Sequence, residues 1–259
     1  MLVLSLPGLF AFLLVLVRLG ALLLTFPLLN ARVVPAHLKL VLLVALSLGL
    51  FPAARVTSPP LPHGVVHLAL LLLGEMLLGM VLGFAAQFVF AGVQLGAELL
   101  SQHMGLSLAT VFDPQEGHSN AVLTNFFYLV VALLFFSLNA HLWFVRAVAE
   151  SLHAVPLLEA KAPPALLGEV LRLGAGMFVS ALRLVAPLSG ILLLTTVALG
   201  IMARLVPQMN VFILAFPINL AVGLLAVSLA LPFLRGYWQQ LVLQLGRDLL
   251  RVLHAVATG

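Results

Sequence analysis

Apolar residues follow one another along this chain in long runs, with few polar positions between them. The runs cover approximately residues 2–29, 38–52, 65–100, 121–145, 173–203 and 205–234. The fourth run has 25 residues and the sixth has 30 without a single Asp, Glu, Lys or Arg. A helix needs about 20 predominantly apolar residues to cross the hydrocarbon core of a bilayer. The pattern therefore predicts an all-α integral membrane protein with about six hydrophobic helical segments.

Composition supports the same fold class. Hydrophobic residues make up 63% of the 259 residues and charged residues 8%, whereas soluble domains contain about 45–50% and about 25%. No stretch is polar enough to form a soluble domain and no Ser/Gly-rich linker divides the chain, so we expect one membrane domain over residues 1–259. The first run continues to Leu29 without a cleavage site, so we expect a retained helix there rather than a signal peptide.

Run length and prolines indicate that several helices are broken or hairpin-like. As one helix, the 36 residues 65–100 would extend about 54 Å, more than the bilayer core. This run therefore either folds back near Gly92 and Gly96 or continues far out of the membrane. The last two runs contain four prolines that each remove a helix hydrogen bond: Pro187, Pro207, Pro217 and Pro232. Broken helices in lipid need protein or water to cover the freed backbone, so we expect this chain to be embedded among other subunits.

The charged residues do not point to nucleic acid or to a fixed membrane orientation. Twelve Lys and Arg against eight Asp and Glu give a net charge of +4, but they are scattered singly, so we expect no nucleic-acid partner. Basic residues fall in loops on both alternating sides, so the positive-inside rule assigns no topology. The tail from Arg235 contains Tyr237 and Trp238, a composition typical of the membrane interface.

No constellation of residues supports catalysis, a cofactor or a metal site. Among eight histidines only His63 and His67 have an i, i+4 spacing, and the glutamate of an H-E-x-x-H motif is missing. His141 follows Asn139 in an apolar run, and we expect it to be hydrogen-bonded at an interface. Nucleophile and phosphate-binding motifs are absent from the sequence. We therefore expect no enzyme and no cofactor. A secondary transporter or small-solute channel stays an alternative, for which inverted repeats and a site at helix breaks would be expected.

Polar and small residues form a stripe along the third run at helical spacing. Glycines four residues apart permit close helix approach, and polar side chains bridge helices. One interpretation is a packing seam, in which Glu75→Gln would be mild because the amide still forms hydrogen bonds. The other is a water-lined polar path, in which the same substitution would be severe. The stripe consists of Glu75, Gly79, Gly83, Gln87, Gly92, Gly96 and Glu98.

The segment after this run is apolar in its middle although polar residues flank it. Leu106, Leu108, Val111 and Phe112 stand where a solvent-exposed loop should be polar, so they must bury against something. One hypothesis is a closure element that fills a pore, with Gly105 among its hinges because glycine tolerates backbone changes. The alternative is simple packing against a neighbouring subunit.

Several short motifs together resemble a known family. The pattern is similar to the FliR family of flagellar export proteins, whose relatives serve virulence-associated type III secretion. The likeness covers nearly the whole chain, and the stretch 207–212 is its most specific part. The motifs are Gln102-x-Met104-Gly105-Leu106-Ser107 followed by Asp113-Pro114, Asn139-x-His141, Arg183-x-x-x-Pro187, Arg204-x-x-Pro207-Gln208-Met209-Asn210-Val211-Phe212 and Phe216-Pro217.

The resemblance implies a subunit of the flagellar export gate in the bacterial inner membrane, at the flagellar basal body. Such a subunit would join FliP and FliQ in a hetero-oligomer, with FlhB and FlhA as further partners, and unfolded flagellar subunits would pass through the assembly. It implies an architecture like a fusion of FliP and FliQ, with helical hairpins above the membrane plane. The plug loop of the family would correspond to Met104, Gly105, Leu106, Leu108, Val111, Phe112, Asp113 and Pro114. The remaining family-motif positions would be Arg183, Pro187, Arg204, Pro207, Gln208, Met209, Asn210, Phe212 and Pro217.

Overall fold

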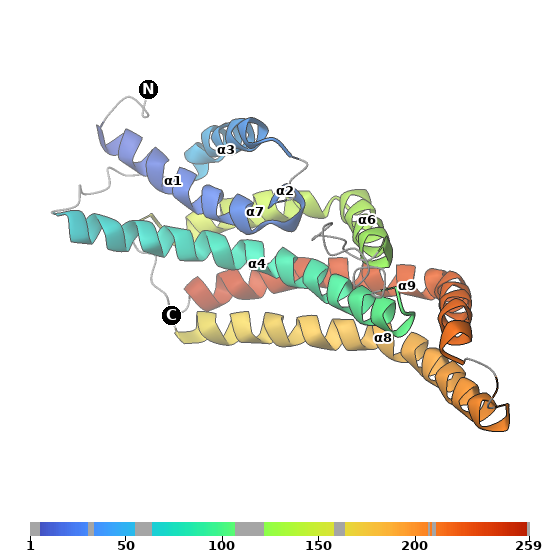
Figure 1. Ribbon diagram of the computed structural model, residues 1–259. Coiled ribbons are helices and arrows are strands. Elements are labelled where there is room, and N and C mark those ends of the chain that lie inside the picture. Colours follow the sequence, from blue (N-terminus) through green and yellow to red (C-terminus); the bar gives the residue numbers. More distant parts are fainter. Residues whose placement is uncertain are drawn as a thin grey trace. The chain divides into compact units, whose positions relative to one another are not determined.

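The structure, a computed structural model, describes residues 6–30, 34–54, 64–106, 122–157, 164–206, 208 and 211–257. Within these ranges every regular element is a helix, which confirms the predicted all-α membrane protein (Figure 1). The elements are α1 (Leu6–Thr25), α2 (Pro27–Asn30), α3 (Ala36–Leu50), the short 3-10 helix η2 (Phe51–Ala54), α4 (Val65–His103), α6 (Val122–Ser137), α7 (Ala140–Ala154), α8 (Pro164–Leu205) and α9 (Val211–Ala257).

The helices coincide largely with the predicted apolar runs. In the described ranges, α1, α4 and residues 166–205 and 214–256 are long and apolar enough to cross a membrane. The pair α6 and α7, bent by 64° at the break between them, makes a fifth candidate span. The third run does not fold back, because α4 is one helix of 39 residues that extends about 58 Å. By contrast α3 has 15 residues and is too short to span, at about 22 Å.

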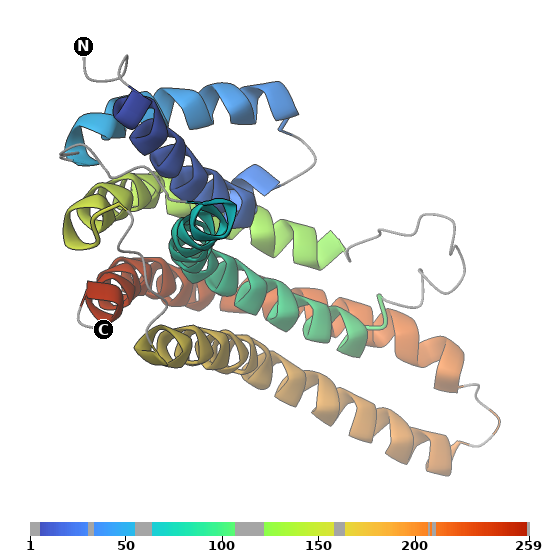
Figure 2. The same cartoon turned by 90° about the vertical axis from the view of Figure 1, so that its left-hand side faces the viewer.

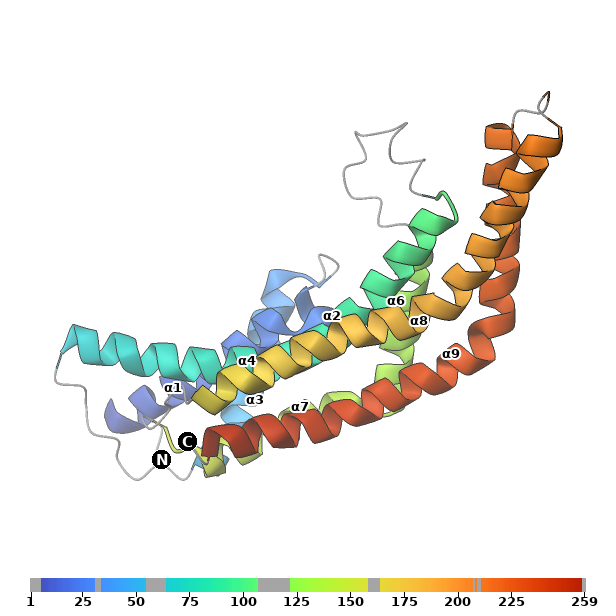
Figure 3. The same cartoon turned by 90° about the horizontal axis from the view of Figure 1, so that it is seen from below.

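The prolines that were expected to break the last two runs lie inside continuous helices. Pro187 lies within α8, and Pro217 and Pro232 lie within α9, while Pro207 is outside the described residues. A long membrane helix tolerates the loss of single hydrogen bonds because the rest of its ladder persists and local adjustments satisfy the freed carbonyls. Figure 3 shows that α9 bends along its length, the usual response of a helix to an internal proline.

The clearest break lies between α6 and α7. Asn139 has a φ of 54°, in the left-handed region, and its backbone N–H donates to the carbonyl of Phe136 at 3.0 Å. Asn is one of the few non-glycine residues that adopt this conformation readily, because its short polar side chain forms local hydrogen bonds. The Asn139 position therefore ends one helix and starts the next.

The chain divides into two compact units, each built from separate stretches of sequence. Unit 1 comprises Met1–Phe88, Phe135–Gly174 and Val242–Gly259, and unit 2 comprises Val89–Leu134 and Ala175–Leu241. In unit 1, α1 and α3 lie side by side (Figures 1 and 2). Phe12 of α1 packs edge-on against Phe51 of η2, with ring centroids 5.9 Å apart. Phe26, Phe135 and Phe144 form an aromatic cluster in the core of unit 1.

The core of unit 2 is built around Trp238. This residue is fully buried and packs edge-on against Phe127 at a centroid distance of 5.0 Å. The expectation that the tail from Arg235 seeks the membrane interface is therefore wrong for Trp238. The physical reason is that α9 continues through the tail to Ala257, which places Trp238 on the packed face of a long helix.

Candidate functional site

A buried ion pair joins α1 and α4 in unit 1. Arg18 Nε donates a hydrogen bond of 2.6 Å to Glu75 Oε2, and both side chains are fully buried. The other guanidinium nitrogens of Arg18 donate to the carbonyl oxygen of Ser151 at 3.0 Å, to its hydroxyl at 3.2 Å and to the carbonyl oxygen of Val155 at 3.2 Å. A charged side chain inside an apolar helix bundle is costly, and such side chains are usually paired with an opposite charge in this way. Arg18 thus connects α1, α4 and the end of α7.

Two glycines beside this pair let α1 and α4 touch through their backbones. A Cβ atom at Gly79 would collide with the carbonyl oxygen of Arg18 and lie 2.9 Å from Ala21 Cβ. A Cβ atom at Gly83 would collide with Thr25 Oγ1 and lie 2.8 Å from the carbonyl oxygen of Leu22. Any larger residue would force the two helices apart.

In unit 2 the second glycine pair of α4 makes a similar contact with α8. A Cβ atom at Gly92 would lie 2.9 Å from the carbonyl oxygen of Met177, and one at Gly96 would lie 3.0 Å from that of Ala181. Glu98 is half-buried, and its Oε2 accepts a hydrogen bond of 3.3 Å from Thr124 Oγ1. Gln87 is also half-buried.

The partner of Glu75 changes the outcome expected for its substitution. A glutamine amide cannot neutralise the guanidinium of Arg18, and an uncompensated buried charge is strongly destabilising. A mild effect of Glu75→Gln is therefore no longer expected, even though Glu75 lies in a packed seam. Sequence reasoning missed the partner, although a signal was present: Arg18 is the only charged residue between positions 2 and 29, and such a residue needs a counter-charge.

The base of the predicted plug loop is held by a glycine cap. The backbone N–H of Gly105 donates to the carbonyl of Gln102, and that of Leu106 donates to the carbonyl of Ser101, both at 3.0 Å. Gly105 has a φ of 79°. This is the Schellman arrangement that ends a helix with a left-handed residue. Gly105 is therefore a helix cap in this structure, and its role as a hinge stays a prediction.

Met104, next to this cap, fits into a notch on α9. Its side chain is fully buried, and a Cβ atom at Gly223 would lie 2.5–2.8 Å from three of its atoms. The close approach explains why position 223 carries a glycine, and no sequence pattern pointed to this contact. Leu106 is half-buried. The other predicted plug residues lie outside the described residues: Leu108, Val111, Phe112, Asp113 and Pro114.

Five of the remaining family-motif residues, whose side-chain exposure the structure describes, lie in unit 2 and are exposed. Arg183, Pro187 and Arg204 lie on α8, Gln208 follows it, and Pro217 lies on α9. Phe212 belongs to the first turn of α9, while Pro207, Met209 and Asn210 lie outside the described residues. These five side chains are therefore not part of the core of unit 2. Among the described residues no group of three or more His, Asp or Glu could hold a metal ion.

Comparison with known proteins agrees with these features. The chain matches the family described as bacterial export proteins, family 1, over residues 9–245. It is 32% identical to the flagellar biosynthetic protein FliR of Pectobacterium carotovorum, over 87% of this chain and 85% of that protein. Its identity to FliR of Escherichia coli K12 is 32%, over 87% and 86%. Its identity to FliR of Bacillus subtilis 168 is 33%, over 82% and 83%.

The match and the helices define a bacterial export protein with several membrane-spanning segments. Within that class, the chain belongs to the FliR family of flagellar biosynthetic proteins. The resemblance inferred from the sequence motifs is therefore confirmed.

Proposed function

We propose that this chain is a subunit of the flagellar type III protein export gate in the bacterial inner membrane. It assembles there with FliP and FliQ, contacts FlhB and FlhA, and forms part of the channel through which unfolded flagellar subunits leave the cell. Residues 1–259 act as one export-gate domain. Membership of the FliR family supports the proposal.

The observation that carries the proposal is the length over which apolar side chains are exposed. Along α8 they extend from Leu167 to Leu205, a distance of about 57 Å. Only 28% of the most apolar part of α8 and 17% of that of α9 is buried inside the chain. A hydrocarbon core of about 30 Å covers roughly half of such a helix. We propose that helices of partner subunits cover the remainder, since a large exposed apolar surface in water marks an interaction site.

We further propose that the loop after Met104 closes the gate. The cap at Gly105 and the burial of Met104 against Gly223 fix the point at which this loop leaves α4. Apolar residues 106–112 would fill the lumen and exclude water and ions, as hydrophobic constrictions do in channels.

Purification of the tagged chain from its native membrane, followed by mass spectrometry of the copurifying proteins, tests the proposal. FliP and FliQ should copurify in a defined complex, and their yield should fall when the exposed Leu194 or Leu229 is replaced by aspartate. A chain that purifies as a monodisperse monomer without these partners would contradict the proposed assembly.

A further inference from the structure

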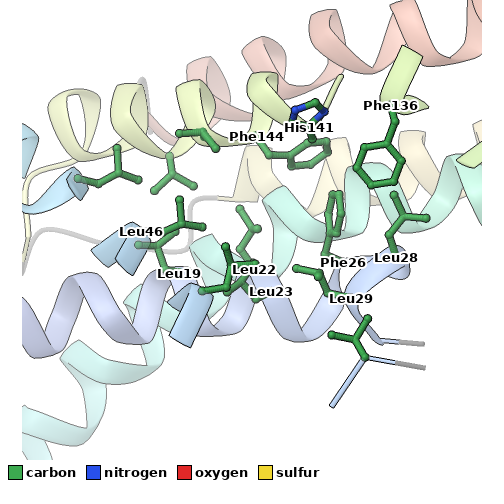
Figure 4. Close-up of a pocket in the computed structure, with 15 residues that line it drawn as sticks. Leu19, Leu22, Leu23, Phe26, Leu28, Leu29, Leu46, Phe136, His141 and Phe144 are labelled. Carbon is green, nitrogen blue, oxygen red and sulfur yellow. The ribbon is translucent and has the colours of Figure 1, made fainter. Parts of the chain in front are cut away.

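Unit 1 contains an apolar pocket of about 550 Å³ between α1, α2, α3, the end of α6 and α7 (Figure 4). Fifteen residues line it, and 14 of them are apolar. The exception is His141. Figure 4 shows the imidazole of His141 beside Phe136 and Phe144 at the edge of the pocket. The ring centroids of His141 and Phe136 lie 5.5 Å apart.

The pocket is open to the surface of the chain, so a group from outside can enter it. Exposure of its apolar lining to water is unfavourable, by about 25 cal/mol for each Å² of apolar surface. An ordered water needs about two to four polar partners, and His141 is the only polar residue of the lining. An apolar group from outside the described part of the chain is therefore the favoured occupant.

The pocket has one polar end and one apolar end. α3 runs antiparallel to α1, since Leu43 packs on Gly20 and Phe51 packs on Phe12. Leu19, Leu46, Leu50 and Val148 therefore lie together at one end and offer only aliphatic carbon.

The opposite end contains Val34, Leu29 and His141. His141 Nδ1 is buried and has no hydrogen-bond partner among the described residues, so the hydrogen bond expected for this histidine at an interface stays a prediction. Lys39 lies three residues before Leu42 and seven before Leu46, on the face of α3 that lines the pocket and toward its Val34 end. Lys39 and the unsatisfied His141 Nδ1 thus both lie toward the Val34 end of the pocket.

We propose that this pocket binds one acyl chain of an anionic membrane phospholipid. The acyl chain extends toward Leu46 and Leu50, the ester group lies near His141 Nδ1, and the phosphate lies near Lys39, because anionic head groups are attracted by basic side chains. The pocket is continuous with the exposed apolar surface of α3, since Leu42 both lines it and is 37% exposed. The outer face of α3 exposes Leu40, Val41 and Leu48. The proposal requires only that the chain is embedded in a membrane, and not that it forms an export gate.

Photolabelling of the full chain, in the complex in which it purifies, tests this. The complex is reconstituted in phosphatidylcholine vesicles that contain a little phosphatidylglycerol with a diazirine in the middle of one acyl chain. After illumination, mass spectrometry of peptides locates the label. We expect label on the α3 stretch 42–50 and on the α1 stretch 19–23, and we expect excess unlabelled phosphatidylglycerol to remove it. Label spread evenly over exposed leucines such as Leu70 and Leu73 of α4 would overturn the proposal.

A pocket-filling variant and a matched control make the test specific. Val145→Phe places an aromatic ring in the pocket and should reduce labelling of α3 about tenfold, whereas Val41→Phe on the exposed face of α3 should leave it unchanged. If Val145→Phe does not assemble, Leu46→Phe replaces it. Equal labelling in the filled and the control variant would exclude the pocket as the binding site.

The head group is tested separately. Lys39→Gln should lower labelling by the phosphatidylglycerol probe to the level of a phosphatidylcholine probe with the same acyl chain. Unchanged preference for the anionic probe would remove Lys39 from the proposal.

A crosslinking experiment distinguishes a lipid from a protein occupant. This chain has no cysteine, so Leu46→Cys introduces a single thiol. If that thiol crosslinks to a partner subunit while lipid label is absent, a protein helix fills the pocket and the lipid proposal is wrong.

Discussion

At the scale of single residues, the Arg18 and Glu75 pair carries the largest energetic consequence in the described structure. Burying two charges costs several kcal/mol for each ion, and their attraction offsets this only when every donor finds an acceptor. Arg18 comes close to that condition, because each of its three side-chain nitrogens donates at least one hydrogen bond, to Glu75, Ser151 or Val155. The intact pair therefore contributes little net stability to the fold. Removal of one partner strongly destabilises the fold, because the other charge stays buried without a counter-charge.

A double-mutant cycle measures this asymmetry. Arg18→Met or Glu75→Met alone should destabilise the chain by about 3–5 kcal/mol, and the double variant should recover most of that loss because no buried charge remains. Glu75→Gln should resemble Glu75→Met. The readout is the midpoint of thermal unfolding of the purified complex.

The exposed pair on α7 provides the control for that cycle. Arg146 Nε and Glu150 Oε1 lie 2.7 Å apart with side chains 80% and 36% exposed, so Glu150→Gln should change stability by less than about 0.5 kcal/mol. Equal losses for Glu75→Gln and Glu150→Gln would contradict the account of the buried pair.

The contact between Met104 and Gly223 yields a second prediction for single residues. Because a Cβ atom at Gly223 would lie 2.5 Å from Met104 Cγ, the Cβ atoms of cysteines at both positions should lie close enough for a disulfide, which needs about 3.5–4.5 Å between them. Mass spectrometry after thiol alkylation measures the bond in the oxidised double variant.

The same variant tests whether the base of the loop moves. If Met104 is a fixed anchor, secretion of flagellar subunits and motility should persist with the bond formed. Met104→Cys alone controls for the loss of the methionine, and a secretion block reversed by reductant would show instead that the loop base moves.

At the scale of elements, the sequence determines where helices form but not which faces pack. The apolar runs predicted most helix positions because a bilayer requires long apolar segments. In such helices apolar residues surround the axis, so hydrophobic periodicity does not identify a buried face. The partner of Glu75, the continuity of α4 and the burial of Trp238 were therefore hidden. For the candidate site, the spacing of the glycines in the sequence predicted which positions permit close helix contact. It did not predict which helices those glycines contact.

Two alanine substitutions separate close packing from helix propensity in these elements. Alanine in place of a helical glycine stabilises by about 0.5–1 kcal/mol when space is available. Gly176 on α8 has nothing within 4 Å of the added Cβ, so Gly176→Ala should raise the midpoint of thermal unfolding. Gly79→Ala should lower it, since the new methyl group collides with the backbone of α1 and overpacking costs about 1–3 kcal/mol. Shifts of the same sign in both variants would contradict backbone contact at Gly79.

At the scale of the whole molecule, the exposed apolar surface predicts that the chain depends on a membrane and on partner subunits. Its exposed apolar helices exceed the bilayer in length, and its motif residues Arg183, Arg204 and Gln208 are exposed. We predict that the chain aggregates when it is produced alone and becomes monodisperse on size-exclusion chromatography when FliP and FliQ are coproduced. A stable, protease-resistant monomer from expression alone would argue against this dependence.

The last prediction concerns closure of the assembled gate. Deletion of residues 107–111 removes most of the apolar loop but keeps Leu106, whose backbone N–H caps α4. If the loop fills the lumen, the deletion should leave assembly intact and raise ion leakage, because a hydrophobic barrier to water is lost. Membrane depolarisation of cells that contain a confirmed intact complex measures the leak.

A variant of unchanged loop length is the control. Five residues in the same loop are replaced by a Gly/Ser sequence of equal length, and this variant should also raise ion leakage if apolar filling matters more than loop length. Reduced complex yield without any leak would mean that the loop packs against a neighbouring subunit, and unchanged permeability in an intact complex would exclude the plug.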